Sequence, residues 1–414
     1  MDPIPEKMWN RDFSLLMLVQ VLAMFGNTTL SFVLPLYILD VIGSPALFGL
    51  VLALAAVPLI LMTPFGGVIA DRASKQRVIF WMDVATTVII ALFLATQGLF
   101  EVLVPVIILK LIVLNVIQGI YMPTAMSAVR FLVPRSKLVP ANAVGAMVFS
   151  LSNSLGPALG SILYASLGLF PVLAGLGVLF ALTAILDLFL RIPFKKQEQS
   201  ATGTLRVVAG DLSGCARFGT REKPLLGSVT LMMFLASIPT IAMLIVSFPV
   251  LVTQTLGLGM ELLGVGQGIM MGGGVLGGVL AGALEKRLTI RRAHWVLLAC
   301  GLFTLPMGLV FMFGISALTA FVILSLSAAL VMLLTQIVLI QILAYVQLET
   351  PAELVGKAVA VVMALAIAAY PIGQLLFGML LERFARLPWA VMFAAALLTV
   401  LVALRSRRYF RQTE

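Results

Sequence analysis

The sequence predicts an all-α integral membrane protein in which twelve transmembrane helices form two six-helix repeats. Hydrophobic residues make up 61% of the 414-residue chain and the mean hydropathy is +1.14, well above the composition of soluble domains. The apolar residues gather in uninterrupted segments of about 20 residues or more, the length that crosses the hydrocarbon core as a helix. Short charged loops separate these segments. The solvent of this chain is therefore the lipid bilayer.

Twelve apolar segments have the required length, and their continuous hydrophobicity excludes the short alternating strands of a transmembrane barrel. We expect helices at about 13–39, 46–70, 77–99, 104–132, 141–164, 170–191, 225–252, 262–284, 293–314, 317–347, 354–381 and 388–405.

Basic residues lie almost entirely between the predicted helices. The chain holds 27 Lys and Arg against 17 Asp and Glu, a net charge of +10, which in a soluble protein would suggest nucleic acid. Of these 27 bases, 24 lie in the N-terminal segment, in the loops after every second helix, or beyond residue 404. All these segments share one face, and their charge identifies it as cytoplasmic. We expect a multi-pass protein of the cell (plasma or inner) membrane, with both termini cytoplasmic and no nucleic-acid partner.

The longest polar stretch divides the helices six and six, into an N-terminal bundle at 1–192, a cytoplasmic linker at 193–224 and a C-terminal bundle at 225–414. Two parallel six-helix repeats place a binding site near the bilayer midplane and expose it to each side in turn. This architecture predicts a secondary active transporter working by alternating access. The internal repeat is indicated by three matches in the same order: GGVIAD (66–71) with GGVLAG (277–282), LVPRSKLVPANA (132–143) with LETPAELVGKAV (348–359), and GPALGSILY (156–164) with YPIGQLLFG (370–378).

Other classes of membrane protein find little support. An enzyme is disfavoured because the single histidine, His294, lies outside any metal-ligand spacing and no G-x-S-x-G motif is present. We expect no cofactor and no metal site. The glycines of the eighth predicted helix lack the Gly-Lys-Ser/Thr of a phosphate loop and indicate close helix packing instead, at Gly264, Gly268 and Gly272.

A cluster of charge follows the second predicted helix, in GGVIADRASKQR at 66–77. It resembles the first signature of the major facilitator superfamily, Gly-x-Leu-Ala-Asp-Arg-x-Gly-Arg-Lys, and the resemblance extends over nearly the whole chain, implying the major facilitator fold. In that family the loop locks the cytoplasmic side, so the resemblance implies a gating latch in which Asp71 accepts hydrogen bonds from Arg77 near helix 11. Ser74 replaces the second glycine of the signature. The predicted latch residues are Gly67, Asp71, Arg72, Lys75 and Arg77.

Further segments resemble the exporter branch that includes drug and macrolide-efflux proteins and the enterobactin exporter. They are LVPRSKLVPANA at 132–143 and GPALG at 156–160, a partial copy of an antiporter signature. The chain departs from the family at Asn115, where helix 4 usually has an arginine proposed to handle protons. Glycines and prolines predict close packing and bends in helices 5 and 11, at Gly156, Pro157, Gly160, Pro371 and Gly373.

Three ionisable residues inside predicted helices form a candidate charge network or proton site. Asp83 lies in the third helix, where a carboxylate is costly and therefore either pairs or binds a proton. Asp187 lies near the inner end of the sixth, with Arg191 four residues on as an ion-pair partner. Lys110 lies nearer the outer surface, where it either extends to the interface or has a functional role.

Helices 1, 4, 7 and 10 line the central cavity in the superfamily, and here they contain amides, hydroxyls and methionines. Such side chains adapt to bulky lipophilic compounds, and they also pack well between helices. The predicted cavity residues are Gln20, Met24, Asn27, Ser31, Asn115, Gln118, Met122, Met232, Thr240, Met243, Gln336, Gln341 and Tyr345.

Together these features predict a monomeric transporter that exports small lipophilic molecules or drugs in exchange for protons. The alternatives within the same fold are a lipid transporter, for example of lysophospholipids, and a nutrient or siderophore-related permease. The lack of basic residues deep in the cavity disfavours small anions such as sugar phosphates. It does not separate a drug from a lipid.

Overall fold

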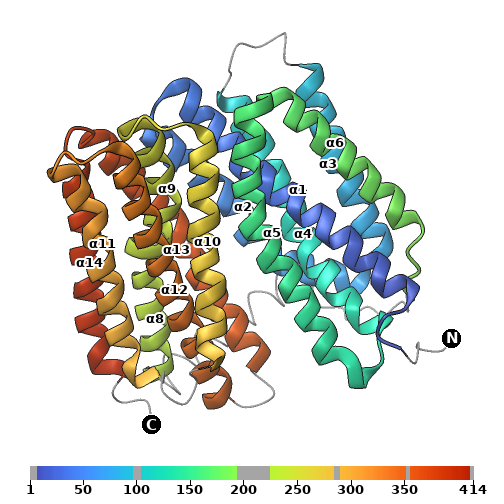
Figure 1. Ribbon diagram of the computed structural model, residues 1–414. Coiled ribbons are helices and arrows are strands. Elements are labelled where there is room, and N and C mark those ends of the chain that lie inside the picture. Colours follow the sequence, from blue (N-terminus) through green and yellow to red (C-terminus); the bar gives the residue numbers. More distant parts are fainter. Residues whose placement is uncertain (1–6, 97–103, 194–223, 284–289, 351–354, 411–414) are drawn as a thin grey trace. The chain divides into compact units, whose positions relative to one another are not determined.

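A computed structural model describes residues 7–96, 104–193, 224–283, 290–350 and 355–410 (Figure 1). Within these residues all regular elements are helices, and twelve helical spans are long and apolar enough to cross a membrane. The predicted all-helical fold with twelve spans is confirmed, and the span ends lie within a few residues of those expected. Most of the predicted linker, residues 194–223, lies outside the described part of the chain.

Contacts between helices divide the chain into two compact units. The first comprises Met1–Tyr37 and Leu54–Thr204, and the second comprises Ile38–Ala53 and Leu205–Glu414. The end of the first helix and the start of the second, at Ile38–Ala53, therefore pack within the second unit.

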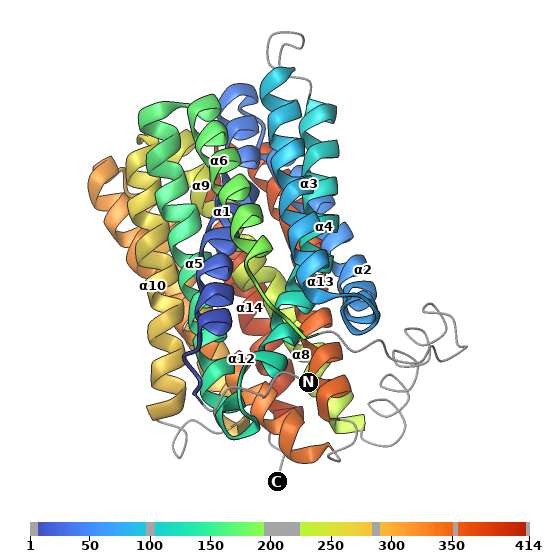
Figure 2. The ribbon, with the colours of Figure 1, turned by 90° about the vertical axis from the view of Figure 1, so that its right-hand side faces the viewer.

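The helices of the first unit run beside one another, and α3 and α4 are neighbours (Figure 2). The first six spans and one short 3₁₀ turn are α1 (Arg11–Ile42), α2 (Pro45–Arg72), α3 (Lys75–Ala95), α4 (Val104–Leu132), η1 (Arg135–Lys137), α5 (Leu138–Leu167) and α6 (Leu169–Leu188).

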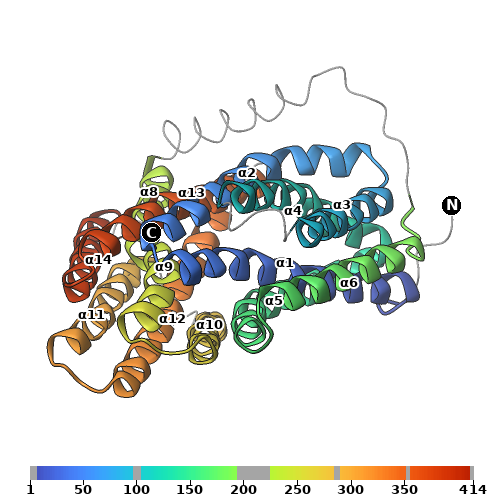
Figure 3. The same ribbon diagram turned by 90° about the horizontal axis from the view of Figure 1, so that it is seen from above.

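In the second unit, α11 and α14 lie side by side (Figure 3). The seventh span is one continuous helix with two π-helical turns, one containing Pro239 and one just after Pro249. Proline cannot donate the usual backbone hydrogen bond, which favours such local widening. The elements are α8 (Pro224–Ser237), η3 (Ile238–Ala242), α9 (Met243–Val250), η4 (Leu251–Thr255), α10 (Met260–Ala283), η5 (Ile290–Arg292), α11 (Ala293–Met312), α12 (Ala317–Glu349), α13 (Val355–Arg383) and α14 (Pro388–Phe410).

Within each unit, the second and fourth helices of the repeat pack closely against each other at a glycine. Gly66 of α2 lies so close to α4 that a Cβ there would stand 2.3 Å from the backbone oxygen of Gly119. In the second unit α10 and α12 meet in the same way, because a Cβ on Gly273 would stand 2.1 Å from the backbone oxygen of Ala329. Neither position has room for a side chain, so glycine sets how closely each pair approaches.

The third and sixth helices of each repeat are also paired. A Cβ on Gly177 of α6 would lie 3.2 Å from Ile90 Cγ2 of α3, and a Cβ on Gly301 of α11 would lie 2.7 Å from Val400 Cγ2 of α14. These repeated pairings agree with the internal repeat predicted from the sequence.

Of the glycines predicted to pack in the eighth span, Gly264 is buried but Gly272 makes no close contact. A Cβ on Gly272 would meet nothing within 4 Å, whereas Gly273 and Gly277 lie against the backbone of α12. The close contact is therefore displaced from Gly272 by one residue, which is about 100° around a helix.

Large apolar side chains lie on the outside of both units. Met147 and Val178 are each 71% exposed and Val279 is 64% exposed. Such exposure would promote aggregation in water but is the expected surface for a protein surrounded by hydrocarbon.

Replacing Gly273 by alanine is expected to destabilise the protein by about 1–3 kcal/mol, because the added methyl group overpacks the contact with α12. The matched control is Gly272→Ala, where the methyl group meets nothing within 4 Å. Thermal unfolding of both purified variants in detergent should show a lowered midpoint for Gly273→Ala only. Equal midpoints would show that α10 and α12 do not approach at this glycine.

Candidate functional site

Two amide side chains of the predicted cavity meet in the first unit. Asn27 Nδ2 of α1 donates a hydrogen bond to Gln118 Oε1 of α4. Asn115 is buried and donates within its own helix to the carbonyl oxygen of Leu111, at 2.9 Å. The structure thus brings α1 and α4 together through uncharged polar groups. Among the other predicted cavity residues of this unit, Gln20 and Met24 are buried, and Ser31 and Met122 are half-buried.

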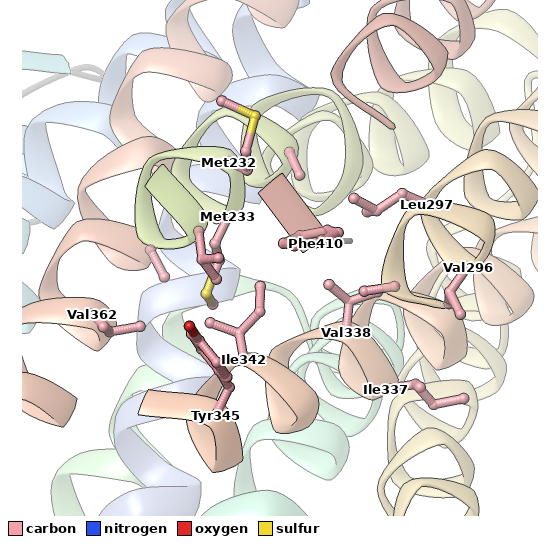
Figure 4. Close-up of a cluster of buried hydrophobic side chains, with 14 of the residues drawn as sticks. Met232, Met233, Val296, Leu297, Ile337, Val338, Ile342, Tyr345, Val362 and Phe410 are labelled. Carbon is pink, nitrogen blue, oxygen red and sulfur yellow. The ribbon is translucent and has the colours of Figure 1, made fainter. Parts of the chain in front are cut away.

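In the second unit, several predicted cavity residues lie in the hydrophobic core. Met232 and Tyr345 belong to a cluster of buried side chains that also contains Ile342 and Phe410 (Figure 4). The amide of Gln341 is also buried, and among the described residues neither its Nε2 nor its Oε1 has a hydrogen-bond partner. The remaining predicted residues are the fully buried Thr240 and Met243 and the half-buried Gln336.

The second unit also contains a cavity that the sequence did not indicate. Its wall, formed by α8, η3, α11, α12 and α13, is apolar apart from Ser237, Thr335 and Tyr370. The hydroxyls of Ser237 and Thr335 donate to carbonyl oxygens of their own helices. The wall therefore presents few polar groups that still need a hydrogen-bond partner. Thr335 precedes the predicted Gln336 by one residue, which places the two side chains about 100° apart around α12.

Lys75 at the start of α3 is buried, with 5% of its surface exposed. Its Nζ donates a 2.8 Å hydrogen bond to the carbonyl oxygen of Ala70 and lies 4.5 Å from the centre of the Phe131 ring. Carbonyls in the last turn of a helix lack helical partners, and a cation there also interacts favourably with the helix dipole. Lys75 therefore links α2, α3 and α4 rather than pointing into solvent.

The other residues of the predicted latch make fewer described contacts. Arg72 and Arg77 are exposed. The side chain of Asp71 lies outside the described part of the structure, and so does its predicted hydrogen bond with Arg77. A Cβ on Gly67 would meet nothing within 4 Å, and the preceding Gly66 makes the close approach.

Two buried carboxylates meet between α3 and α6. Asp83 is 2% exposed and lies within hydrogen-bonding distance of Thr183 and of the fully buried Asp187. The expected ion pair between Asp187 and Arg191 is not formed, because α6 ends at Leu188 and Arg191 is exposed beyond it. Neither oxygen of Asp187 has a hydrogen-bond donor among the described residues.

Lys110 does not join this pair. Its Nζ lies 3.7 Å from the centre of the Phe93 ring, a cation–π contact between α4 and α3. The predicted network of three ionisable residues is therefore reduced to the two carboxylates.

The small residues predicted in the fifth and eleventh spans, which are α5 and α13, are packing positions. Gly156 of α5 accommodates Thr28 of α1, whose Oγ1 would stand 2.0 Å from a Cβ at that glycine. In the second unit a Cβ on Gly373 of α13 would lie 2.4 Å from Ala242 Cβ in η3. Both helices also contain the predicted prolines, and α5 has a further glycine against α1: Pro157, Pro371 and Gly160.

Sequence reasoning missed a carboxylate that caps α2 within the second unit. Glu382 Oε2 of α13 accepts a 3.0 Å hydrogen bond from the backbone N–H of Ala46 and another from the hydroxyl of Ser44. Ser44 is itself the N-cap of α2, since its Oγ accepts from the backbone N–H of Leu47 at 3.1 Å. No spacing could have revealed this contact, because Ser44 and Glu382 are 338 residues apart.

The chain matches the model of a known protein family. The model of the Major Facilitator Superfamily matches residues 16–366, most of the chain. The chain belongs to the Major Facilitator Superfamily. It is accordingly a multi-pass membrane transporter and not an enzyme.

Solved structures of transporters in this superfamily's fold are similar over almost the full chain. A variant of the nucleoside transporter NupG is 15% identical, with a TM-score of 0.74 and 96% of this chain and 99% of that chain covered. A bacterial homolog of the human lysosomal transporter Spinster is 16% identical, with a TM-score of 0.73 and coverages of 97% and 96%. A D-xylose–proton symporter is 14% identical, with a TM-score of 0.73 and coverages of 97% and 98%. No curated protein matches the chain by sequence.

The replacements Ser44→Ala and Glu382→Ala are expected to destabilise the protein by about 0.5–2 kcal/mol and about 0.3–1 kcal/mol, respectively. The loss in the double variant should be smaller than the sum, because both side chains act on the first turn of α2. Thermal unfolding of the two single variants and the double variant completes the cycle. Strictly additive losses would contradict a direct contact between these side chains.

Proposed function

We propose that this transporter exports small lipophilic molecules from the cell by alternating access, driven by exchange for protons. The observation that supports this most directly is the lack of fixed charge in the four helices expected to face the substrate. No Asp, Glu, Lys or Arg occurs at residues 13–39, 111–129, 224–255 or 317–348, the central parts of α1, α4, the seventh span and α12. A charged substrate would lose its hydration there without gaining an ionic partner.

The polar groups in these helices favour an uncharged compound with a few hydrogen-bonding atoms. The paired amides of Asn27 and Gln118 offer further donor and acceptor positions. The buried amide of Gln341 offers two polar atoms that no described residue satisfies. A bound compound that supplied partners for this amide would remove the cost of leaving it unpaired.

Uptake of a neutral nutrient and movement of a lipid are the alternatives. Uncharged amides and hydroxyls also suit a sugar or nucleoside, and the similar structures include a nucleoside transporter and a D-xylose–proton symporter. A lysophospholipid shares the apolar character of the proposed substrates. The direction of movement and the response to each compound class distinguish these alternatives.

The same proposal includes an orientation and an assembly state. The distribution of Lys and Arg supports cytoplasmic termini in the cell membrane, with the latch on the same side. We propose that the transporter works as a monomer, because each six-helix repeat of the one chain supplies half of the site in this architecture.

Inside-out vesicles energised by respiration should release protons from the lumen when a transported compound is added, as reported by a pH-sensitive dye. Uncharged lipophilic drugs such as chloramphenicol, lipophilic cations, lysophospholipids, nucleosides and xylose are added in turn, with vesicles lacking the protein as control. We expect release with an uncharged lipophilic drug, and not with a lipophilic cation, which would find no ionic partner in these helices. Proton release only from vesicles preloaded with nucleosides or xylose would replace export by nutrient uptake, because a symporter moves the proton and the nutrient out of the lumen together. Release only with lysophospholipids would identify a lipid transporter.

Asp71→Asn is expected to slow transport several-fold and to change substrate affinity by no more than a few fold, because a latch biases conformation without touching substrate. Initial transport rates and equilibrium substrate binding measure the two effects. The control is Asp40→Asn, which alters an exposed carboxylate of α1. A normal rate for Asp71→Asn would show that Asp71 does not act as a latch.

A further inference from the structure

Asp83 and Asp187 belong to two antiparallel helices whose register brings them together. Toward one end of the contact, Gln76 Nε2 of α3 donates a 3.1 Å hydrogen bond to the backbone oxygen of Asp187. Toward the other end, Ile90 of α3 lies against Gly177 of α6. Asp83 is midway between Gln76 and Ile90 in sequence, so it faces α6 about one to two turns inward from Asp187. Side chains tilt toward the N-terminus of their own helix, so in antiparallel helices these two carboxylates lean toward each other.

The two carboxylates are enclosed and have no basic partner. Asp83 is 2% exposed and Asp187 is 0% exposed. Among the residues that the structure describes, neither forms an ion pair, and three of their four oxygens have no hydrogen-bond donor. The remaining contact of Asp83 is with Thr183, whose hydroxyl also lies 2.8 Å from the carbonyl oxygen of Phe180.

The charged groups of the surrounding helices do not neutralise this pair. On α3 and α4, Lys75 bonds to Ala70 and Lys110 lies against Phe93. The arginines of these helices and of the segment after α6 are exposed: Arg77, Arg130 and Arg191. The segment Leu138–Leu167, which forms α5, contains no charged residue. On α1, which packs against α6 at Gly26, Arg11 is exposed, and Asp12 accepts a 3.2 Å hydrogen bond from the backbone N–H of Arg191.

Tyr121 of α4 is a further buried titratable group in the first unit. It is 3% exposed, and its hydroxyl has no hydrogen-bond partner among the described residues. The charges of both Asp83 and Asp187 act on this hydroxyl. It therefore lies within electrostatic range of the pair but makes no hydrogen bond to it.

Two ionised carboxylates in contact would place two like charges in a low-dielectric interior, and such pairs retain a proton instead. A shared proton removes one charge and provides the missing hydrogen-bond donor between the oxygens. We infer that Asp83 and Asp187 form a proton-binding site, in which one carboxyl group donates to the other.

The place of this site in the fold suits the coupling of protons to transport. Asp187 is in the last turn of α6, at the end that the basic loops assign to the cytoplasm. The equivalent helices of the second unit, α11 and α14, contain no acidic residue. The coupling role rests on the proposed proton-driven export, whereas the binding of the proton does not depend on that proposal.

Infrared difference spectroscopy of the purified wild-type transporter tests proton binding directly. At neutral pH the wild type should show the C=O stretch of a protonated carboxyl group, which disappears in alkaline buffer. Asp83→Asn and Asp187→Asn should each lack this band, while Asp40→Asn, a change at an exposed carboxylate, should retain it. Tyr121→Phe should also retain the band, because the Tyr121 hydroxyl makes no hydrogen bond to the pair. Thermal unfolding confirms that each variant is folded, which we expect because asparagine has nearly the same shape without the charge.

A neutral-pH band that persists in both Asn variants would overturn the proton site. Sodium that raises the unfolding midpoint of the wild type at constant pH, but not that of Asp83→Asn, would also overturn it in favour of a sodium site. The vesicle assay separates the coupling role: Asp83→Asn should bind substrate and release no protons. If the wild type releases none, the proposed function fails while the infrared result stands. If Asp83→Asn releases as many protons as the wild type, the coupling role is wrong.

Discussion

Inside a bilayer a polar group finds no water, so each one must find its hydrogen-bond partner within the protein. Helices satisfy the backbone. Many hydroxyl side chains are satisfied in the same local way: Thr86, Thr124 and Thr335 each donate to the carbonyl oxygen four residues earlier in their own helix. These residues are polar, but their hydroxyl groups need no hydrogen-bond partner on a neighbouring helix.

Amides and carboxylates cannot be satisfied so simply, because they have more donors or acceptors than one helical turn can match. Their remaining groups must reach another helix or a ligand. Asn27 bonds Gln118, Glu382 bonds the first turn of α2, and Asp83 approaches Asp187. The amide of Gln341 has no such partner among the described residues. The proposed substrate contacts and the proposed proton site both consist of groups that their own helices leave unsatisfied.

These contacts between polar side chains require that the helices approach one another closely. Hydrocarbon does not drive apolar helices together, so packing depends on surfaces that fit closely. Gly66 and Gly273 perform this role in equivalent helix pairs of the two units. The units are similar in backbone but differ in chemistry, since α3 and α6 hold two carboxylates whereas α11 and α14 hold none. The same helix arrangement therefore holds the proposed proton site in the first unit only.

The twelve spans, the helical class and the placement of Asp83 and Asp187 within the bilayer could be predicted from the sequence alone, because hydrophobicity and the cost of a buried charge are local properties. It did not determine which face of each helix meets which neighbour. These helices are apolar on most sides, so their pattern contains little information about direction. A shift of one residue separates Gly272 from the packing Gly273, and Gln336 from Thr335 in the cavity wall. Only the tertiary structure showed that α6 ends before Arg191 and that Glu382 caps a helix 338 residues away, because such contacts follow from how helices pack and not from spacing along the chain.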